Sequence, residues 1–221
     1  MITKINRPVQ IIFVGPVGAG KSHIIDDVAK YFALKEIKII KADTLGREIV
    51  TDPINRDTLV SLFDKYGMTI LINGAVNTAL LLEAIMSNDA LCTEFDTFQK
   101  PLILEEYNQL VKEFAEDALF PDVQFVFFEC GPALSHITVG QYAMVIGLYV
   151  SEEVQKMRLF KDHPHYPEKL IEYLQARQTR SILERLSDYF LDTSKIVYGS
   201  KIYEEHAYAI ASIIKSKKNL I

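Results

Sequence analysis

The sequence predicts an α/β protein of three layers, in which helices cover both faces of a central parallel sheet. Two observations lead to this fold class. Strand-like apolar runs alternate with helical patterns at both ends of the 221-residue chain, and 49% hydrophobic residues are enough for a sizeable core. The first run, Val9–Val14, is apolar on both faces, as expected of a central parallel strand.

The loop after this strand carries the most informative motif of the chain. Residues 15–22 read GPVGAGKS, the G-x-x-x-x-G-K-S pattern of a P-loop, and a helix is predicted from Ser22 to Leu34. Glycines let backbone N–H groups turn towards phosphate oxygens, and the helix start adds unpaired donors. Lys21 supplies a cation for the β- and γ-phosphates, and the Ser22 hydroxyl is a ligand for Mg²⁺. The motif predicts a P-loop NTPase fold that binds a nucleoside triphosphate through Gly15, Gly18, Ala19, Gly20, Lys21 and Ser22.

The second predicted strand, Ile37–Ile40, ends where a carboxylate and a helix begin. In a parallel α/β sheet the carboxyl ends of the strands carry the ligands, so Asp43 is placed where chemistry would occur. A carboxylate within reach of a hydroxyl can accept its proton during phosphoryl transfer. The alternative for Asp43 is a helix N-cap.

The alternation of strands and helices stops between about residues 52 and 120. Helices are predicted over Arg56–Tyr66, Asn77–Met86 and Pro101–Ala118, and no strong strand interrupts them. Breaks between them are expected at Pro53, Gly67, Gly74 and Pro101. This segment is predicted to be a helical insertion that binds the phosphate acceptor, within a single domain of residues 1–221 whose core is about 1–50 and 121–221.

The strand pattern resumes in the last hundred residues. Strands are predicted over Val123–Phe128, Ala143–Val150 and Tyr189–Leu191, and a terminal helix over Lys201–Lys215. Glu129 follows the first of these strands and is either an active-site carboxylate or an exposed glutamate at a strand end.

A helical lid is predicted at about residues 155–181. Ser151 is the expected N-cap of its first helix, and a long second helix is expected from Glu168 to about Arg185. Arg158 and Arg180 are candidates for binding the transferred phosphoryl group, or they belong to a solvated helix face; Arg177 lies one turn from Arg180 and is interchangeable with it.

Composition excludes several classes of protein. A net charge of −5 gives no basic footprint for a nucleic acid, and two cysteines make neither a disulfide framework nor a zinc site. The sequence shows no apolar segment of membrane-spanning length and no secretory signal, so a cytoplasmic protein without a membrane partner is expected. His163 and His165 lack a third metal ligand in the sequence and indicate a solvated turn.

Several stretches resemble the dephospho-coenzyme A kinase family of P-loop kinases over nearly the full length. Besides the P-loop, Ala42–Arg47 (ADTLGR) is similar to the family's A-D-x-x-x-R, and Phe63–Gly67 (FDKYG) to a helix that ends in an aromatic residue and glycine. Lys100–Ile103 is similar to its H-P-L-I stretch, with lysine in place of histidine. Ser151–Arg158 and the region from Gln178 to Asp188 resemble the opening and closing of its lid.

The resemblance implies transfer of the γ-phosphate of ATP, with Mg²⁺, to the 3′-hydroxyl of dephospho-CoA. It places Asp43 as the base or orienting group for that hydroxyl, Arg47 beside the acceptor, and Arg158 and Arg180 over the phosphoryl group. Glu129 is assigned to the substrate side. The cations fit an anionic, loose transition state, which needs positioned charge more than covalent chemistry.

The chain departs from the family pattern at several positions: Lys41, Asn73, Lys100, Glu129, Leu183 and Thr193. These departures concern the acceptor side and the adenine pocket, whereas the phosphate-binding motif is kept. Two further hypotheses follow: a kinase of another nucleoside or nucleotide-like acceptor, and a nucleotide-binding regulatory protein without turnover. The sequence does not predict the oligomeric state.

Overall fold

The computed structural model describes residues 7–131, 142–164, 166, 168–175 and 180–218. Its contacts divide the chain into two compact units. Unit 1 comprises Met1–Lys41 and Leu110–Ile221, and unit 2 comprises Ala42–Gln109. Unit 2 therefore contains most of the segment expected to form the helical insertion.

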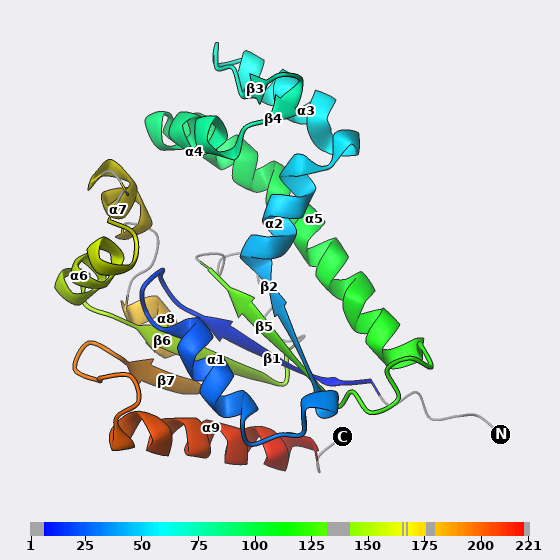
Figure 1. The fold of residues 1–221 in the computed structure, drawn as a ribbon, viewed down its shortest axis with the longest axis vertical. Helices are drawn as coiled ribbons and strands as arrows, with labels where there is room; N and C mark the ends of the chain where they lie inside the picture. The colour runs from blue at the N-terminus through cyan, green and yellow to red at the C-terminus, as the bar shows by residue number, and fades with distance from the viewer. Residues whose placement is uncertain (1–6, 132–141, 165, 167, 176–179, 219–221) are drawn as a thin grey trace. The chain divides into compact units, whose positions relative to one another are not determined.

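A five-stranded parallel sheet forms the centre of unit 1 (Figure 1). Its order is β2-β5-β1-β6-β7. The strands are β1 (Val9–Val14), β2 (Ile37–Lys41), β5 (Phe125–Cys130), β6 (Met144–Tyr149) and β7 (Tyr189–Asp192). The strand that carries the P-loop lies in the middle of the sheet, and all carboxyl ends meet at one edge. The predicted parallel α/β fold is confirmed.

Strand β5 begins two residues later than predicted and includes Glu129. The backbone N–H of Val123 bonds to Phe120 in a turn, whereas the ladder with β1 runs from Phe125 to Cys130. Tertiary pairing, rather than the apolar run, thus sets the ends of the strand.

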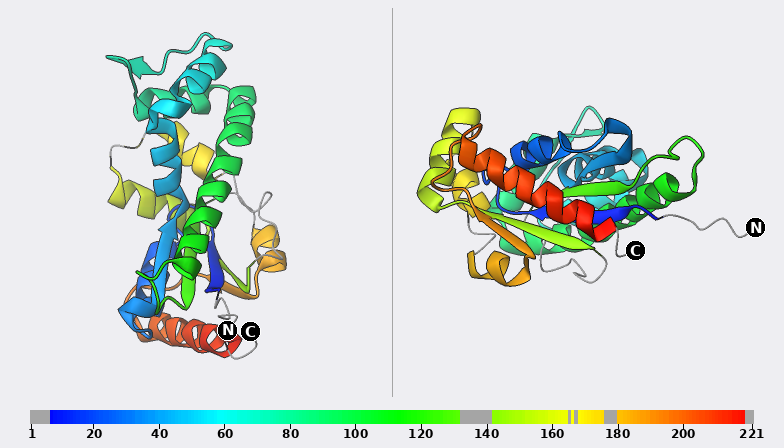
Figure 2. Two further views of the ribbon diagram at one scale, coloured as in Figure 1. Left: turned by 90° about the vertical axis from the view of Figure 1, so that its right-hand side faces the viewer. Right: turned by 90° about the horizontal axis from the view of Figure 1, so that it is seen from below.

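Helices lie on both faces of the sheet, which gives three layers. Phe127 and Ile146 belong to a buried cluster shared with α1 (Lys21–Ala29) and α9 (Lys201–Lys218). Figure 2 shows α9 running along the sheet beside α1. On the opposite face, α8 (Arg180–Leu186) packs on β6, where a Cβ at Gly147 would overlap the hydroxyl of Ser187.

The first helix is shorter than the predicted range of Ser22 to Leu34. After Ala29 the chain turns, with the N–H of Phe32 bonded to the carbonyl of Ala29, and a 3₁₀ helix follows at Leu34–Glu36. The turn lets the ring of Phe32 pack edge-on against Phe125 and Phe127 of β5. Burial of this aromatic ring therefore ends the helix.

The predicted lid contains α6 (Glu152–Asp162) and α7 (Glu168–Gln175). The single helix expected from Glu168 to about Arg185 is described as α7 and α8, and residues 176–179, including Arg177, lie outside the described residues. Ser151 stands at the N-cap of α6, but its side chain makes no capping bond; its backbone N–H donates to the hydroxyl of Ser194 at 2.8 Å. The predicted N-cap position is confirmed, but the side-chain capping bond is not made.

Unit 2 is mainly helical. Its elements are α2 (Ala42–Thr51), α3 (Pro53–Asp64), β3 (Leu71–Ile72), β4 (Ala75–Val76), α4 (Thr78–Ser87) and α5 (Asp89–Glu116), the last of which continues into unit 1. The side chain of Asp52 caps α3 by accepting from the N–H of Ile54, with Pro53 at the first helical position. Phe63 and Phe95 pack edge to face at 6.1 Å in its core.

Two predictions for this unit were wrong. Pro101 does not break a helix but lies inside α5, where the carbonyl of Thr97 that loses its helical partner is at an exposed position. A short antiparallel hairpin also interrupts the helices, with Asn73 and Gly74 in left-handed backbone conformations at its turn. Among the described residues, the structure has no helix long and apolar enough to cross a membrane.

Candidate active site

The P-loop connects the carboxyl end of β1 to the first residue of α1. Gly15 runs so close to β6 that a Cβ there would overlap the carbonyl oxygen of Leu148. Gly20 precedes the helix with φ of +87°, and a Cβ there would overlap the ring of Tyr198. At these two positions, close packing or a left-handed backbone requires glycine.

Three successive P-loop carbonyls are held by side chains from distant parts of unit 1. Gln155 Nε2 donates to Val17 O at 2.7 Å, and Arg158 Nη1 donates to Gly18 O at 2.9 Å. The hydroxyl of Thr193 lies 3.0 Å from Ala19 O. Because N–H and C=O of a trans peptide point in opposite directions, the amides joined to these carbonyls face away from the anchors. The arrangement preorganises backbone donors for an anion.

Lys21 is folded back onto the start of the loop. Its Nζ donates to Gly15 O at 2.9 Å and to Pro16 O at 3.1 Å, and only 8% of the residue is exposed. The ammonium group is therefore fixed beside the same peptides that would surround a phosphate.

Ser22, Glu129 and Lys41 form a cluster at the carboxyl edge of the sheet. The Ser22 hydroxyl donates to Glu129 Oε1 at 2.6 Å, and the Lys41 ammonium lies 3.5 Å from Oε2. Oε2 is buried and has no hydrogen-bond partner among the described groups. A hydroxyl and a carboxylate with a spare buried oxygen are hard oxygen ligands, and they fit Mg²⁺. The structure thus joins two residues that are 107 positions apart in the sequence.

Arg158 bonds to protein groups in this structure. Besides Gly18, its guanidinium donates to the Thr193 hydroxyl at 3.0 Å and the Thr193 carbonyl at 2.8 Å. It also lies 4.7 Å from the centroid of the Tyr198 ring, on which His23 stacks at 4.4 Å. Burial raises the pKa of the Tyr198 phenol, which keeps it neutral beside the arginine.

Arg180, the other lid arginine, contacts two carboxylates. It donates to Glu184 at 2.8 Å and to Asp192 at 2.6 Å, and its guanidinium lies over the ring of Tyr149. Burial raises the pKa of Asp192, but hydrogen bonds from Ser194 and the charge of Arg180 outweigh it, so the pKa lies below its ordinary value.

Asp43 and Arg47 belong to unit 2, on the exposed side of α2. Asp43 lies in the first turn of this helix, where a negative charge interacts favourably with the helix dipole. Arg47 follows four residues later and shares that face.

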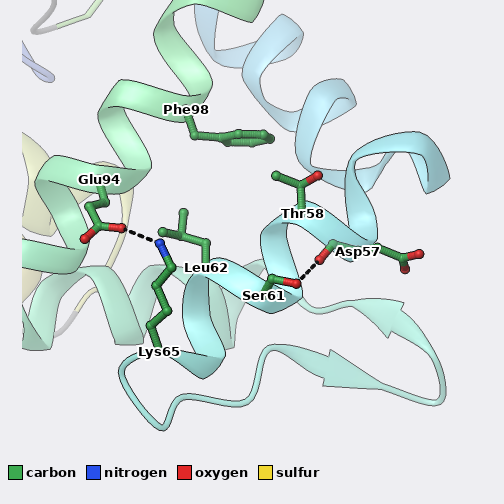
Figure 3. A pocket seen from close by; sticks show the side chains of 7 residues that line it. All are labelled: Asp57, Thr58, Ser61, Leu62, Lys65, Glu94 and Phe98. Atoms are coloured by element: carbon green, nitrogen blue, oxygen red, sulfur yellow. Dashed lines mark hydrogen bonds and ion pairs between the residues drawn. The ribbon is translucent and has the colours of Figure 1, made fainter.

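Unit 2 also has an open pocket of about 480 Å³ between α3 and α5 (Figure 3). Leu62 and Phe98 provide apolar surface, and the ion pair between Lys65 and Glu94, 3.2 Å long, lies at its side. None of the predicted site residues lines it. Hydrogen bonds from Tyr66 and Lys65 lower the pKa of Glu94.

Sequence reasoning did not predict the contacts that Gln155, Thr193 and Tyr198 make with the P-loop. Gln155 is 2% exposed and lies three positions before Arg158, on the same side of α6. A glutamine one turn before a candidate arginine is only a weak signal in the sequence, because its burial is known from the structure alone. Tyr198 has no comparable signal, because its contact with Gly20 depends on the tertiary fold. His163 stacks on Tyr166, and His165 lies outside the described residues.

The parallel sheet, the P-loop and the residues that anchor it define a P-loop NTPase fold. The family model of dephospho-CoA kinase matches residues 9–196, so the chain belongs to this family. This membership supports ATP-dependent phosphorylation of dephospho-CoA by a small-molecule kinase. No curated protein sequence matches the chain.

Solved structures with this fold share little sequence with the chain. A protein called TT1252 from Thermus thermophilus is similar, with a TM-score of 0.68 and 14% identity, over 95% of this chain and 98% of that one. The dephospho-CoA kinase from Campylobacter jejuni gives a TM-score of 0.62 and 15% identity, over 96% and 98%. At these identities the likeness shows the fold.

Proposed function

We propose that this chain binds ATP at the P-loop and transfers the γ-phosphate to the 3′-hydroxyl of dephospho-CoA, forming CoA and ADP. The observation that carries the proposal is the anchored P-loop beside the Ser22–Glu129 pair, in a member of this family. The backbone of Gly15, Gly18, Ala19 and Gly20 surrounds the phosphates. Lys21 adds positive charge at the bridge that breaks.

Mg²⁺ is the metal that this proposal requires. Ser22 and Glu129 would hold it, through the hydroxyl and the carboxylate oxygens. When bound, the ion neutralises charge on the β- and γ-phosphates.

Asp43 is proposed as the base for the acceptor hydroxyl. The 3′-oxygen forms a bond to the γ-phosphorus while the bond from phosphorus to the β–γ bridging oxygen breaks, and the carboxylate takes the hydroxyl proton. The exposed side chains of Asp43 and Arg47 on one face of α2 support an acceptor role, with Arg47 binding the anionic part of the acceptor.

Arg158 and Arg180 are proposed to bind the transferred phosphoryl group when nucleotide is present. Each must then exchange present partners for phosphate oxygens: Arg158 its bonds to Thr193, and Arg180 its pairs with Glu184 and Asp192. Both lie in unit 1, as does the P-loop.

The cytoplasmic location stays a prediction from the sequence.

The test is phosphate transfer from ATP to dephospho-CoA by wild type, Lys21→Ala and Asp43→Asn, with an omission control for each substrate. The wild type is expected to form CoA. Both variants are expected to lose at least 100-fold in kcat/KM, since each removes charge stabilisation or proton transfer from the transition state. Full turnover by Asp43→Asn would refute the assigned base. ATP binding without CoA formation by the wild type would refute the acceptor.

A further inference from the structure

The ion pair between Lys41 and Glu129 is built into the sheet. Lys41 is the last residue of β2, and in the parallel ladder it is the partner of Glu129 on β5. Its ammonium lies 3.5 Å from Oε2, beyond the usual length of a hydrogen bond but within that of an ion pair. The lysine side chain is 49% exposed and the glutamate side chain 14%.

The two oxygens of Glu129 have different surroundings. Oε1 accepts from Ser22, whereas Oε2 is buried, has no hydrogen-bond partner among the described groups and lies 3.5 Å from the Lys41 ammonium. A divalent ion held by Ser22 and Glu129 would therefore share this carboxylate with the Lys41 ammonium. Two positive charges beside one carboxylate repel each other, and solvent at the half-exposed lysine screens part of this repulsion.

We propose that the charge of Lys41 lowers the affinity of the Ser22–Glu129 pair for a bare divalent cation. The metal is then retained chiefly when it arrives together with a triphosphate. The phosphates cancel the positive charge of the ion, so its repulsion from the Lys41 ammonium becomes small. This inference rests on the proposed function for the identity of the site, and it adds a role for Lys41 in setting the metal affinity of that site.

The exposure of the Lys41 side chain determines how much the metal affinity is expected to change. Solvent screens its charge, so removal of one positive charge is expected to change metal affinity roughly three- to tenfold rather than by the larger factor of a dry site. Replacement of Lys41 by a negatively charged residue is expected to raise the metal affinity by a second factor of similar size.

The test uses Mn²⁺ as the probe, with free Mn²⁺ measured by electron paramagnetic resonance. The full-length chain is compared with Lys41→Arg, Lys41→Met, Lys41→Gln and Lys41→Glu, with and without a non-hydrolysable ATP analogue. Without the analogue, Mn²⁺ affinity is expected to stay the same for Arg, to rise for Met and Gln, and to rise most for Glu. With the analogue, the spread among the variants is expected to shrink to about twofold or less.

Lys38→Met is the matched control. Lys38 is on the same strand, but its ammonium lies 4.7 Å from the centroid of the Phe120 ring and not beside Glu129. Its Mn²⁺ affinity is expected to equal that of the wild type. Ser22→Ala with Glu129→Gln removes the site and is expected to abolish the Mn²⁺ binding that responds to Lys41.

Two results would overturn the inference. Weaker Mn²⁺ binding by the Met, Gln and Glu variants would mean that Lys41 holds Glu129 in place rather than opposing the metal. Equal binding by all variants would mean that its charge does not reach the metal. The Mn²⁺ measurement involves no phosphate acceptor. If the variants show the expected order of Mn²⁺ affinities but the wild type forms no CoA, only the proposed acceptor is refuted.

Discussion

At the scale of single residues, Thr193 connects three parts of the site. It is fully buried, and its hydroxyl lies 3.0 Å from the carbonyls of Ala19 and Tyr149 while it accepts from Arg158. One side chain thus fixes the P-loop, the end of β6 and the lid arginine. This position was noted in the sequence only as a departure from the family pattern.

Thr193→Val is predicted to weaken both the fold and nucleotide binding. The methyl group keeps the volume but removes the hydroxyl that bonds to the carbonyl of Ala19, and an unsatisfied buried carbonyl costs about 1–3 kcal/mol of stability. ATP affinity is expected to fall roughly tenfold because the loop loses an anchor, measured by calorimetry beside urea unfolding. Thr97→Val, at an exposed helix position, is the control. Unchanged ATP affinity would show that the hydroxyl does not hold the loop.

Gly20→Ala is predicted to be more harmful than Gly67→Ala. Both glycines have a positive φ, +87° and +67°, so both substitutions carry the strain of a left-handed alanine, about 1–2 kcal/mol. At Gly67 nothing lies within 4 Å of the added Cβ, whereas at Gly20 the Cβ would overlap Tyr198. Denaturant unfolding should show a larger loss of stability for Gly20→Ala than for Gly67→Ala. Addition of Tyr198→Ala to the Gly20→Ala variant should remove part of this extra loss. Equal losses at the two glycines would contradict the close contact.

At the scale of elements, strands were predicted better than their connections. The apolar runs found each strand of the large sheet, because buried parallel strands are hydrophobic on both faces. The β3–β4 hairpin was missed although its Asn73–Gly74 turn is a strong hairpin signal. Pro101 was predicted to separate two helices, but it lies within α5. Phe95 and Tyr107, which precede and follow the proline in this helix, are both buried, and this burial keeps α5 continuous.

Pro101→Ala is predicted to stabilise the protein. Alanine restores an N–H donor for the carbonyl of Thr97 and removes the ring clash, at an exposed helix position. A gain of about 1–3 kcal/mol is expected in urea unfolding. Pro53→Ala is the control, because Pro53 occupies the first turn of α3, where a proline needs no partner. A loss of stability in Pro101→Ala would mean that α5 needs its proline.

At the scale of the whole molecule, much of the phosphate site could be predicted and the rest of the candidate site only in part. Lys21, Ser22 and Asp43 could be named as candidates because the P-loop motif and the strand ends are local in the sequence, and their roles stay predictions. The pairing of Ser22 with Glu129, and of Lys41 with Glu129, depends on which strands are neighbours. Side chains that bridge distant elements, such as Gln155, leave only weak marks in one sequence.

ATP with Mg²⁺ is predicted to raise the melting temperature of the wild type. A ligand at 100 times its Kd adds about 2.7 kcal/mol to the stability of the native state. Chelation of the metal by EDTA should reduce this shift in the wild type but should have little further effect in Ser22→Ala, which lacks the hydroxyl ligand. An equal response of Ser22→Ala and wild type to EDTA would place the metal elsewhere.

The most direct measurement of the central claim is product analysis after incubation of the wild type with ATP, Mg²⁺ and dephospho-CoA. Mass spectrometry and phosphorus NMR would identify the product and the position of the new phosphate. The account predicts CoA, with the phosphate on the 3′-hydroxyl, in equal amount to ADP. ADP without CoA, or a phosphate at another position, would contradict it.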